Sequence, residues 1–289
     1  MYPLSRVPWA PFGAGGRRWK GDKDMDQLIG TLAREFQVRP EHAQAVVELL
    51  DEGNTVPFIA RYRKERHGGM DDQTIRELAD RLAYLRGLEQ RREEVKAAVQ
   101  EQGKLTPQLE AAIDRAATLA EVEDLYRPYR PKRRTRAGIA REKGLEPLAQ
   151  LLWNGKDSQG RPLRQSPEEL AQSFVNPEKG VETVEEAVQG AKDILAEDFS
   201  DDAGIRKRLR AMLQKNGVLR SSAAKEEDSV YSLYYDFEEP VRRLQSHRVL
   251  AINRGEKEGF LKVSLYPGEE SPLPRILRDV PSRHPYWEL

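Results

Sequence analysis

Apolar residues recur at helical spacing near the start of the chain. A first helix is predicted over residues 26–38, and a second opens at Pro40 and stops before Gly53. The apolar positions of the first helix are Leu28, Ile29, Leu32 and Phe36. The two short helices resemble a helix-turn-helix pair. Most helical hairpins are packing units, so this pattern alone does not indicate DNA reading.

A much longer helix is predicted from Asp72, as its capping residue, to about residue 102, before Gly103. Its apolar positions recur at threes, fours and one seven, close to the heptad pattern of a coiled coil. These positions are Ile75, Leu78, Leu82, Leu85, Leu88, Val95 and Val99. About thirty residues span roughly 45 Å. Such a helix needs partners along its length, and we expect the next helices to complete a long helical hairpin.

Capping residues mark the starts of the later helices. The expected N-caps are Thr106, Thr118, Thr135, Ser166, Thr183 and Asp201. Glu121, Glu169 and Glu186 stand three residues after a Thr or Ser, which is the pattern of a capping box. Residues 154–165 are polar and contain glycine, so they predict a loop or hinge between two groups of helices.

Residues 260–266 alternate between apolar and polar and predict a strand. One strand cannot form a sheet, so either Val218 and Leu219 pair with it or its partner is missing. From Pro267 onward no period of 2 or 3.6 remains. The predicted fold class is therefore mainly all-α. It combines a helix-turn-helix-like pair, a long helical hairpin or coiled coil and a helical bundle with a short strand near the C-terminus.

Composition narrows the possible functions. The chain has 289 residues, and its 48 basic and 48 acidic residues balance, so polyanion binding would need a local patch. No cysteine is present, which excludes disulfides and cysteine-based zinc sites and fits a reducing cytoplasm. No apolar run approaches the roughly 20 residues of a membrane helix. We expect a cytoplasmic protein without a membrane partner.

One local patch stands out in residues 125–136, which we call the basic segment. From Arg127 to Lys143 the chain carries eight basic residues and a single acid, Glu142. Interleaved prolines favour an extended backbone that displays these charges. The arginines would then contact phosphates, and the tyrosines would stack on unpaired bases. Alternatively, the segment is a solvated linker whose cations pair with nearby acids such as Glu121, Glu123 and Asp124.

Catalytic motifs are absent from the sequence. It contains no phosphate-binding glycine loop, no paired-histidine zinc motif and no nucleophile elbow. Acidic pairs stand where helix starts and solvated loops expect them. We therefore expect no enzyme, no cofactor, no metal and no small-molecule substrate. The candidate nucleic-acid-binding residues are Arg127, Arg130, Lys132, Arg133, Arg134 and Arg136, with Arg61, Arg63 and Lys64 as a second patch.

Two long strings resemble signature segments of the Tex family of bacterial transcription accessory proteins. They are GNTVPFIARYRKE at 53–65 and DLYRPYRPKRRTR at 124–136, and residues 139–148 and 246–259 match as well. The resemblance covers about residues 25–266. It implies an RNase H-like domain, helix-hairpin-helix elements and an S1 RNA-binding domain further on, and none of these is in this sequence.

The resemblance and the patterns together predict four regions. Residues 1–24 are a disordered extension, and residues 25–153 form a Tex-like N-terminal helical domain with the long helix. Residues 154–266 form a second helical segment that leads toward the RNase H-like domain, and residues 267–289 form a disordered, unrelated tail. We expect the chain to be a truncated relative of the family.

Two functions remain open at this point. The first is a transcription accessory protein that binds RNA or DNA weakly through phosphates, in a salt-dependent manner and without sequence readout. The second is a helical scaffold that holds protein partners such as the transcription machinery and binds no nucleic acid itself.

Overall fold

The computed structural model describes residues 22–156, 159–225, 227–268, 271–276 and 285–286. The chain divides into two compact units, residues 1–122 and residues 123–289. Each unit is described by itself. The predicted disordered extension lies almost entirely outside the described residues, although the first helix already begins at Asp22.

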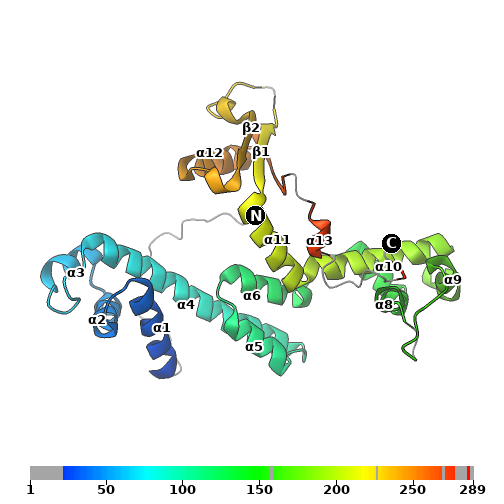
Figure 1. Cartoon of the computed structure of the whole chain (residues 1–289), viewed down its shortest axis with the longest axis horizontal. Coiled ribbons are helices and arrows are strands. Elements are labelled where there is room, and N and C mark those ends of the chain that lie inside the picture. Colours follow the sequence, from blue (N-terminus) through cyan, green and yellow to red (C-terminus); the bar gives the residue numbers. More distant parts are fainter. Residues whose placement is uncertain (1–21, 157–158, 226, 269–270, 277–284, 287–289) are drawn as a thin grey trace. The chain divides into compact units, whose positions relative to one another are not determined.

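Six helices build the first unit, the last of which crosses into the second. They are α1 (Asp22–Glu35), α2 (Pro40–Asp51), α3 (Val56–Tyr62), α4 (Asp72–Glu101), α5 (Pro107–Arg115) and α6 (Leu119–Tyr126). In Figure 1, α1, α2 and α3 gather around the first half of α4, and α5 lies along its second half. The predicted long helical hairpin is thus present.

The apolar positions predicted along α4 do face inward. Ile75, Leu78 and Leu82 join the core with α1, α2 and α3. Leu88, Val95 and Val99 are buried further along the helix, whereas Leu85 is half-buried. The N-cap is Asp71, whose carboxylate accepts the Thr74 N–H at 2.7 Å, and not the predicted Asp72. Either acid would suit this position, so composition alone cannot choose between them.

The helix pair α1–α2 is a packing unit. Its inner faces carry the core residues of this unit, including Leu32, Val46 and Leu49. The outer face of α2 exposes Glu41 and Glu48. A helix that reads DNA needs an outer face compatible with phosphates, and an acidic face repels them. The described geometry therefore gives no support to DNA reading by this pair.

The second unit contains helices and one small sheet. Its helices are α7 (Arg136–Glu142), α8 (Glu146–Asn154), α9 (Pro167–Ala171), α10 (Val184–Asp201), α11 (Ala203–Asn216), α12 (Ser246–Lys257) and α13 (Leu273–Ile276). Its strands are β1 (Val218–Ala223), β2 (Asp236–Pro240) and β3 (Leu261–Tyr266). Short 3-10 turns occupy Arg127–Tyr129, Gln172–Phe174, Pro177–Lys179, Ser232–Tyr234 and Val241–Arg243.

The predicted caps account for most of these helix starts. Thr135 accepts the Gly138 N–H at 2.9 Å, and Ser166 forms a complete capping box with Glu169. One cap is displaced, because α10 continues through Asp201 and the cap of α11 is Asp202, which accepts from Ile205. That shift leaves Asp201 free to act as a buried partner for cations, as described below.

Helix α10 is the centre of the core in this unit. Its residues Ala187, Ala191 and Ile194 are buried together with residues of α7, α8 and α9. The backbones approach closely at Gly190, where an added Cβ would lie 2.3 Å from Leu145 Cδ1 and 3.3 Å from Ala140 Cβ. Glycine is required there by packing, although the position is helical.

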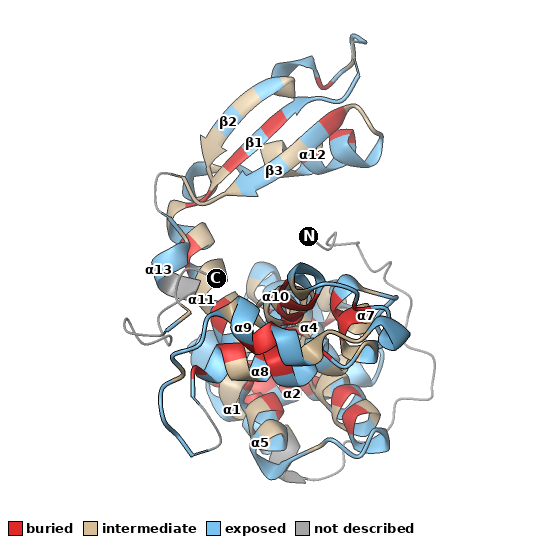
Figure 2. Cartoon of the chain, turned by 90° about the vertical axis from the view of Figure 1, so that its right-hand side faces the viewer, coloured by how far each residue is buried: buried red, intermediate tan, exposed pale blue. Residues whose placement is uncertain are grey.

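The predicted strand finds its partner in the sheet. β1 pairs antiparallel with β3, so the alternative that named Val218 and Leu219 is confirmed. β1 also pairs antiparallel with β2, which the sequence pattern did not predict. Two acids and a proline dominate β2, and all three residue types are depleted in strands. Figure 2 shows the resulting order, with β1 between β2 and β3.

The predicted fold class, mainly α with a strand near the C-terminus, is confirmed. The division between units falls between Val122 and Glu123, so residues 127–153 belong with α10. The predicted division after Trp153 stays a prediction about the domains. Within the predicted tail, α13 and the Tyr286 side chain are described, and the Tyr286 hydroxyl donates to the Gln165 carbonyl at 3.0 Å. Residues 269–270, 277–284 and 287–289 lie outside the description.

Two glycine substitutions test the packing of α10. Gly190→Ala should lower the free energy of unfolding by about 1–3 kcal/mol, because the buried Leu145 must shift to admit the methyl group. Gly87→Ala on α4, where nothing lies within 4 Å of the added Cβ, should raise it by about 0.5–1 kcal/mol. Urea unfolding followed by circular dichroism measures both. A Gly190→Ala protein as stable as the parent would contradict the close packing.

Candidate nucleic-acid interface

The basic segment changes conformation along its length. Pro128 opens the 3-10 turn Arg127–Tyr129, and the chain then extends, with Arg130 at φ −68° and ψ 135°. Pro131 fixes the next φ and disfavours a helix before it. Helix α7 resumes only after Thr135 provides its cap. The stretch between the two helices is therefore extended, as the prolines predicted.

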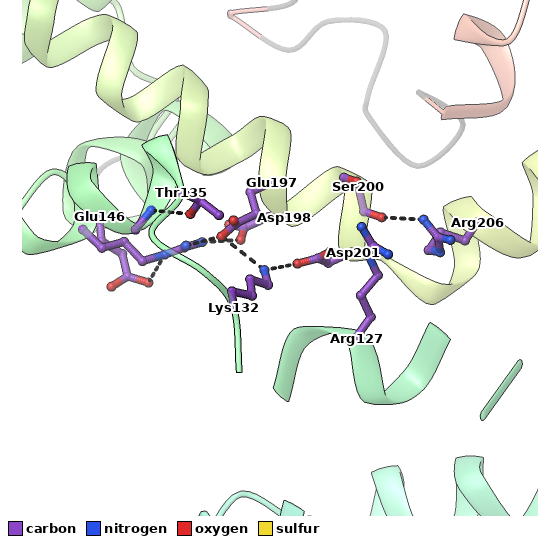
Figure 3. Close-up of polar contacts among 11 residues, drawn as sticks. Arg127, Lys132, Thr135, Glu146, Glu197, Asp198, Ser200, Asp201 and Arg206 are labelled. Carbon is purple, nitrogen blue, oxygen red and sulfur yellow. Dashed lines mark hydrogen bonds and ion pairs between the residues drawn. The ribbon is translucent and has the colours of Figure 1, made fainter. Parts of the chain in front are cut away.

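One half of the basic segment turns toward α10. The Arg127 Nε donates to Asp201 Oδ1 at 2.7 Å, and Lys132 Nζ pairs with the other oxygen of Asp201. Lys132 also lies 3.3 Å from a Glu197 oxygen. The Asp201 side chain is only 8% exposed, so these pairs are shielded from solvent. Figure 3 shows Arg127 and Lys132 approaching Asp201 from the two sides.

Three acids close the last turns of α10, and we call Glu197, Asp198 and Asp201 the carboxylate cluster. Negative charge at a helix C-terminus opposes the helix dipole. The cluster is offset by Arg127 and Lys132, and by Arg141, which donates to Glu197 at 2.5 Å and to Asp198 at 2.6 Å. The basic segment therefore stabilises this end of α10.

Protonation of the cluster follows these contacts. Burial alone would raise the pKa of Glu197, but hydrogen bonds from Arg141, Thr135 and Lys132 outweigh it and hold this pKa below its ordinary value of 4.5. Burial raises the pKa of the neighbouring Asp198 carboxyl, and the attraction of Arg141 only partly opposes that rise. The two adjacent acids are thus shifted in opposite directions.

The predicted linker pairing holds in part. Arg130 pairs with Glu123, as that alternative expected. Asp124, however, is buried and bound by two cations of α11, with Arg206 at 2.6 Å and Arg210 on the other oxygen. Glu121 accepts the Ala117 N–H at 2.7 Å, which is a capping contact. The main partners of the segment are instead acids of α10, far away in sequence.

The other half of the segment faces solvent. The Arg134 side chain is 75% exposed and lies 4.0 Å from Glu142, and Arg136 is 85% exposed and lies 3.9 Å from Asp193. Arg133 is exposed and forms no ion pair within the described part of the chain. Pairs at the distance limit between exposed side chains contribute little. Arg133, Arg134 and Arg136 therefore keep their charge available to a ligand.

The second predicted patch lies in the first unit, at the end of α3. Arg61 and Lys64 are exposed, whereas Arg63 packs its guanidinium 5.3 Å from the centre of the Phe58 ring. Between them, Tyr62 is 63% exposed. Sequence reasoning missed Tyr62, although an aromatic residue flanked by arginines was the available signal. It also missed Arg141, whose role depends on α10.

Other kinds of site were examined on the same residues. Within the described ranges, no group of three or more His, Asp or Glu side chains is placed to hold a metal ion. No described helix is long and apolar enough to cross a membrane. His67 is fully buried, with one ring nitrogen 3.2 Å from the Ile59 carbonyl. It packs inside the turn that carries the second patch.

The fold and these contacts define a mainly helical protein with a basic loop, half paired internally and half displayed. Comparison with known proteins is more specific. Residues 26–100 match the Tex-like protein N-terminal domain, and residues 163–283 match the Tex central region-like domain. The chain belongs to the Tex family. The central match extends to residue 283, into the segment that sequence patterns set apart as an unrelated tail.

Individual relatives agree with this assignment. The chain is 45% identical over 243 residues to Protein tex of Bordetella pertussis, which covers 83% of this chain and 30% of the relative. It is 41% identical over 249 residues to the transcriptional accessory protein Tex of Neisseria gonorrhoeae, covering 84% and 31%. It is 29% identical over 276 residues to the human S1 RNA-binding domain-containing protein 1, covering 91% and 26%. The chain spans about a third of the length of the bacterial relatives.

Removal of the shared carboxylate tests the pairing on α10. Asp201→Ala should lower the free energy of unfolding by about 1–3 kcal/mol, because two cations lose a buried partner. The same substitution on the same helix, Asp193→Ala, serves as the control. Its ionic partner Arg136 is exposed and 3.9 Å away, so a change within about 0.5 kcal/mol is expected for that pair. Equal losses in both variants, measured by urea unfolding, would argue against the shielded pairs.

Acid unfolding tests the opposite shifts in the cluster. The lowered pKa of Glu197 gives stability that is full above about pH 4.5 and is lost as the pH falls through the folded-state pKa. Glu197→Gln should therefore lose less stability than the parent on acidification. Asp198, whose pKa is raised, acts with the opposite sign, so Asp198→Asn should lose more. Urea unfolding at several pH values between about 3 and 7 measures the slopes, and identical slopes in all three proteins would refute both assignments.

Proposed function

We propose that this chain is a Tex-like transcription accessory module that binds RNA or DNA through phosphates, without reading the base sequence. The observation that carries this proposal is the exposure of Arg133, Arg134 and Arg136 in one extended stretch. Three guanidinium groups on a loop outside any pocket suit a backbone better than a base edge. The names of the relatives, transcriptional accessory protein and S1 RNA-binding domain-containing protein, support the same class of role.

The nine candidate residues contribute unequally under this proposal. Arg127, Arg130 and Lys132 are engaged with acids, so a phosphate must compete with those carboxylates for them. We therefore expect the displayed arginines to provide most of the contact and the binding to be weak at physiological salt. In the first unit, Arg61 and Lys64 would add phosphate contacts, and the exposed Tyr62 ring would stack on an unpaired base.

A second candidate is a scaffold for protein partners such as the transcription machinery, with no nucleic-acid binding of its own. One observation favours it. Val230 and Leu233 are 87% and 84% exposed in the turn before β2. Apolar side chains this exposed are common at protein interfaces, and a phosphate backbone does not need them. Under either candidate we propose a non-enzymatic role in the cytoplasm, with no cofactor, no small-molecule substrate and no membrane partner.

Salt dependence distinguishes the two candidates. We expect binding to duplex DNA and single-stranded RNA that weakens steeply with salt and is insensitive to sequence. Replacing Arg133, Arg134 and Arg136 together with Ala should reduce the log–log salt slope on duplex DNA by about 2–3, since each phosphate contact contributes about 0.9. Fluorescence anisotropy with labelled oligonucleotides at several salt concentrations measures the slope.

The control removes three exposed arginines from elsewhere, Arg34, Arg39 and Arg115, so the net charge changes equally. Its slope should stay near that of the parent. Equal effects of the two triple variants would show that only total charge matters, which contradicts a role for the basic segment. No binding by the parent at low salt would leave the scaffold as the function.

A further inference from the structure

The backbone hydrogen bonds of the sheet reveal which groups face its two borders. Ala223 N–H donates to Tyr235 O at 3.0 Å, and Ala224 N–H donates to Phe260 O at 2.8 Å. Bonded pairs alternate along antiparallel strands. Odd-numbered residues of β1 therefore bond to β2, and even-numbered residues bond to β3. The same rule assigns the outward-facing groups of each border strand.

The border at β2 is protected against further pairing. Its residues Phe237 and Glu239 lie opposite Ser221 and Leu219 and bond to β1. The outward-facing residues are Asp236, Glu238 and Pro240. Two carboxylates repel an acidic neighbour, and a proline has no N–H to donate. Charges and prolines are the devices by which proteins blunt exposed sheet edges.

The border at β3 has no such protection. Lys262 and Ser264 lie opposite Ser222 and Arg220 and bond to β1. The outward-facing residues are Leu261, Val263 and Leu265, all apolar, each with an N–H and a C=O directed away from the sheet. Among the described residues no strand pairs with this border, and Leu265 is 41% exposed. An open, apolar edge of this kind is a template for another strand.

We propose that the β3 edge pairs with the β3 edge of a second copy of this chain, antiparallel about a two-fold axis at Val263. The strand is complementary to itself in this arrangement. Val263 lies opposite Val263, Leu261 opposite Leu265, and Lys262 opposite Ser264. The apolar pairs share the face covered by α12, and no like charges are directly opposed. The contact is a closed, two-fold interface that continues the sheet across both copies.

The neighbouring registers are less favourable. Moving the second copy by two residues in one direction places Lys262 directly opposite Lys262, which is repulsive. Moving it the other way places Leu261 opposite Pro267, which lacks the N–H that a bonded pair requires. A shift by one residue would turn the apolar side chains of the added strand to the opposite face. Chemistry on β3 thus selects one register.

Two substitutions disrupt this edge by different means. Val263→Pro removes an outward N–H while the bonds to β1, made by Lys262 and Ser264, remain, and proline is tolerated at sheet borders. Leu265→Lys places a charge on the edge, as natural proteins do. Leu250→Lys is the matched control, because Leu250 is 70% exposed on α12 and is not part of the edge. Circular dichroism checks that each variant is folded.

Sedimentation equilibrium of the full chain over a range of concentrations tests the proposal. The parent and Leu250→Lys should form a dimer, and Val263→Pro and Leu265→Lys should weaken dimerisation by about tenfold or more. A parent that stays monomeric throughout would overturn the proposal. So would a dimer that survives both edge variants, or one that Leu250→Lys dissociates equally. These outcomes do not depend on nucleic-acid binding.

Hydrogen exchange supplies a residue-level readout. The amides of Lys262 and Ser264 are bonded within the sheet and should be protected at every concentration. Those of Leu261, Val263 and Leu265 should gain protection only as the dimer forms. Protection that rises with concentration at other strands, and not at these three residues, would place the interface elsewhere and overturn the proposal.

Discussion

The second unit depends on one electrostatic constraint, the accumulation of acids at the C-terminal end of α10. Glu197, Asp198 and Asp201 stand where the helix dipole is already negative, and Asp201 is nearly excluded from water. Uncompensated, such an arrangement would fray the helix whose other end holds the core. Cations from the basic segment and from α7 provide the compensation. Positioning of the segment and completion of α10 are therefore the same event.

This constraint divides the basic segment between two tasks. The cations that complete α10 are shielded and paired, and those that follow Lys132 extend into solvent. The prolines make the division possible, because they hold the chain extended between α6 and α7. A uniformly solvated linker would display all of its charges and hold none of them in place. The displayed arginines gain a fixed base at the expense of the total charge offered to a ligand.

Local chemistry made most of the fold predictable. The apolar positions of α4, the caps at Thr106, Thr135 and Ser166, and the strand at β3 are all visible in short windows of sequence. The errors were also local, because adjacent acids compete for one cap and a strand rich in acids lacks the usual signature. The pairing of the basic segment was beyond such reasoning. Its partners lie about seventy residues away, at |i−j| of 69 and 74, and only tertiary packing brings them together.

A double-mutant cycle on Arg127 and Asp201 tests the central claim most directly. The free energy of unfolding is measured for the parent, Arg127→Ala, Asp201→Ala and the double variant. The account predicts a coupling energy of about 1–2 kcal/mol, because a charged hydrogen bond shielded from water is lost once and not twice. A coupling energy indistinguishable from zero would show that the basic segment does not support α10.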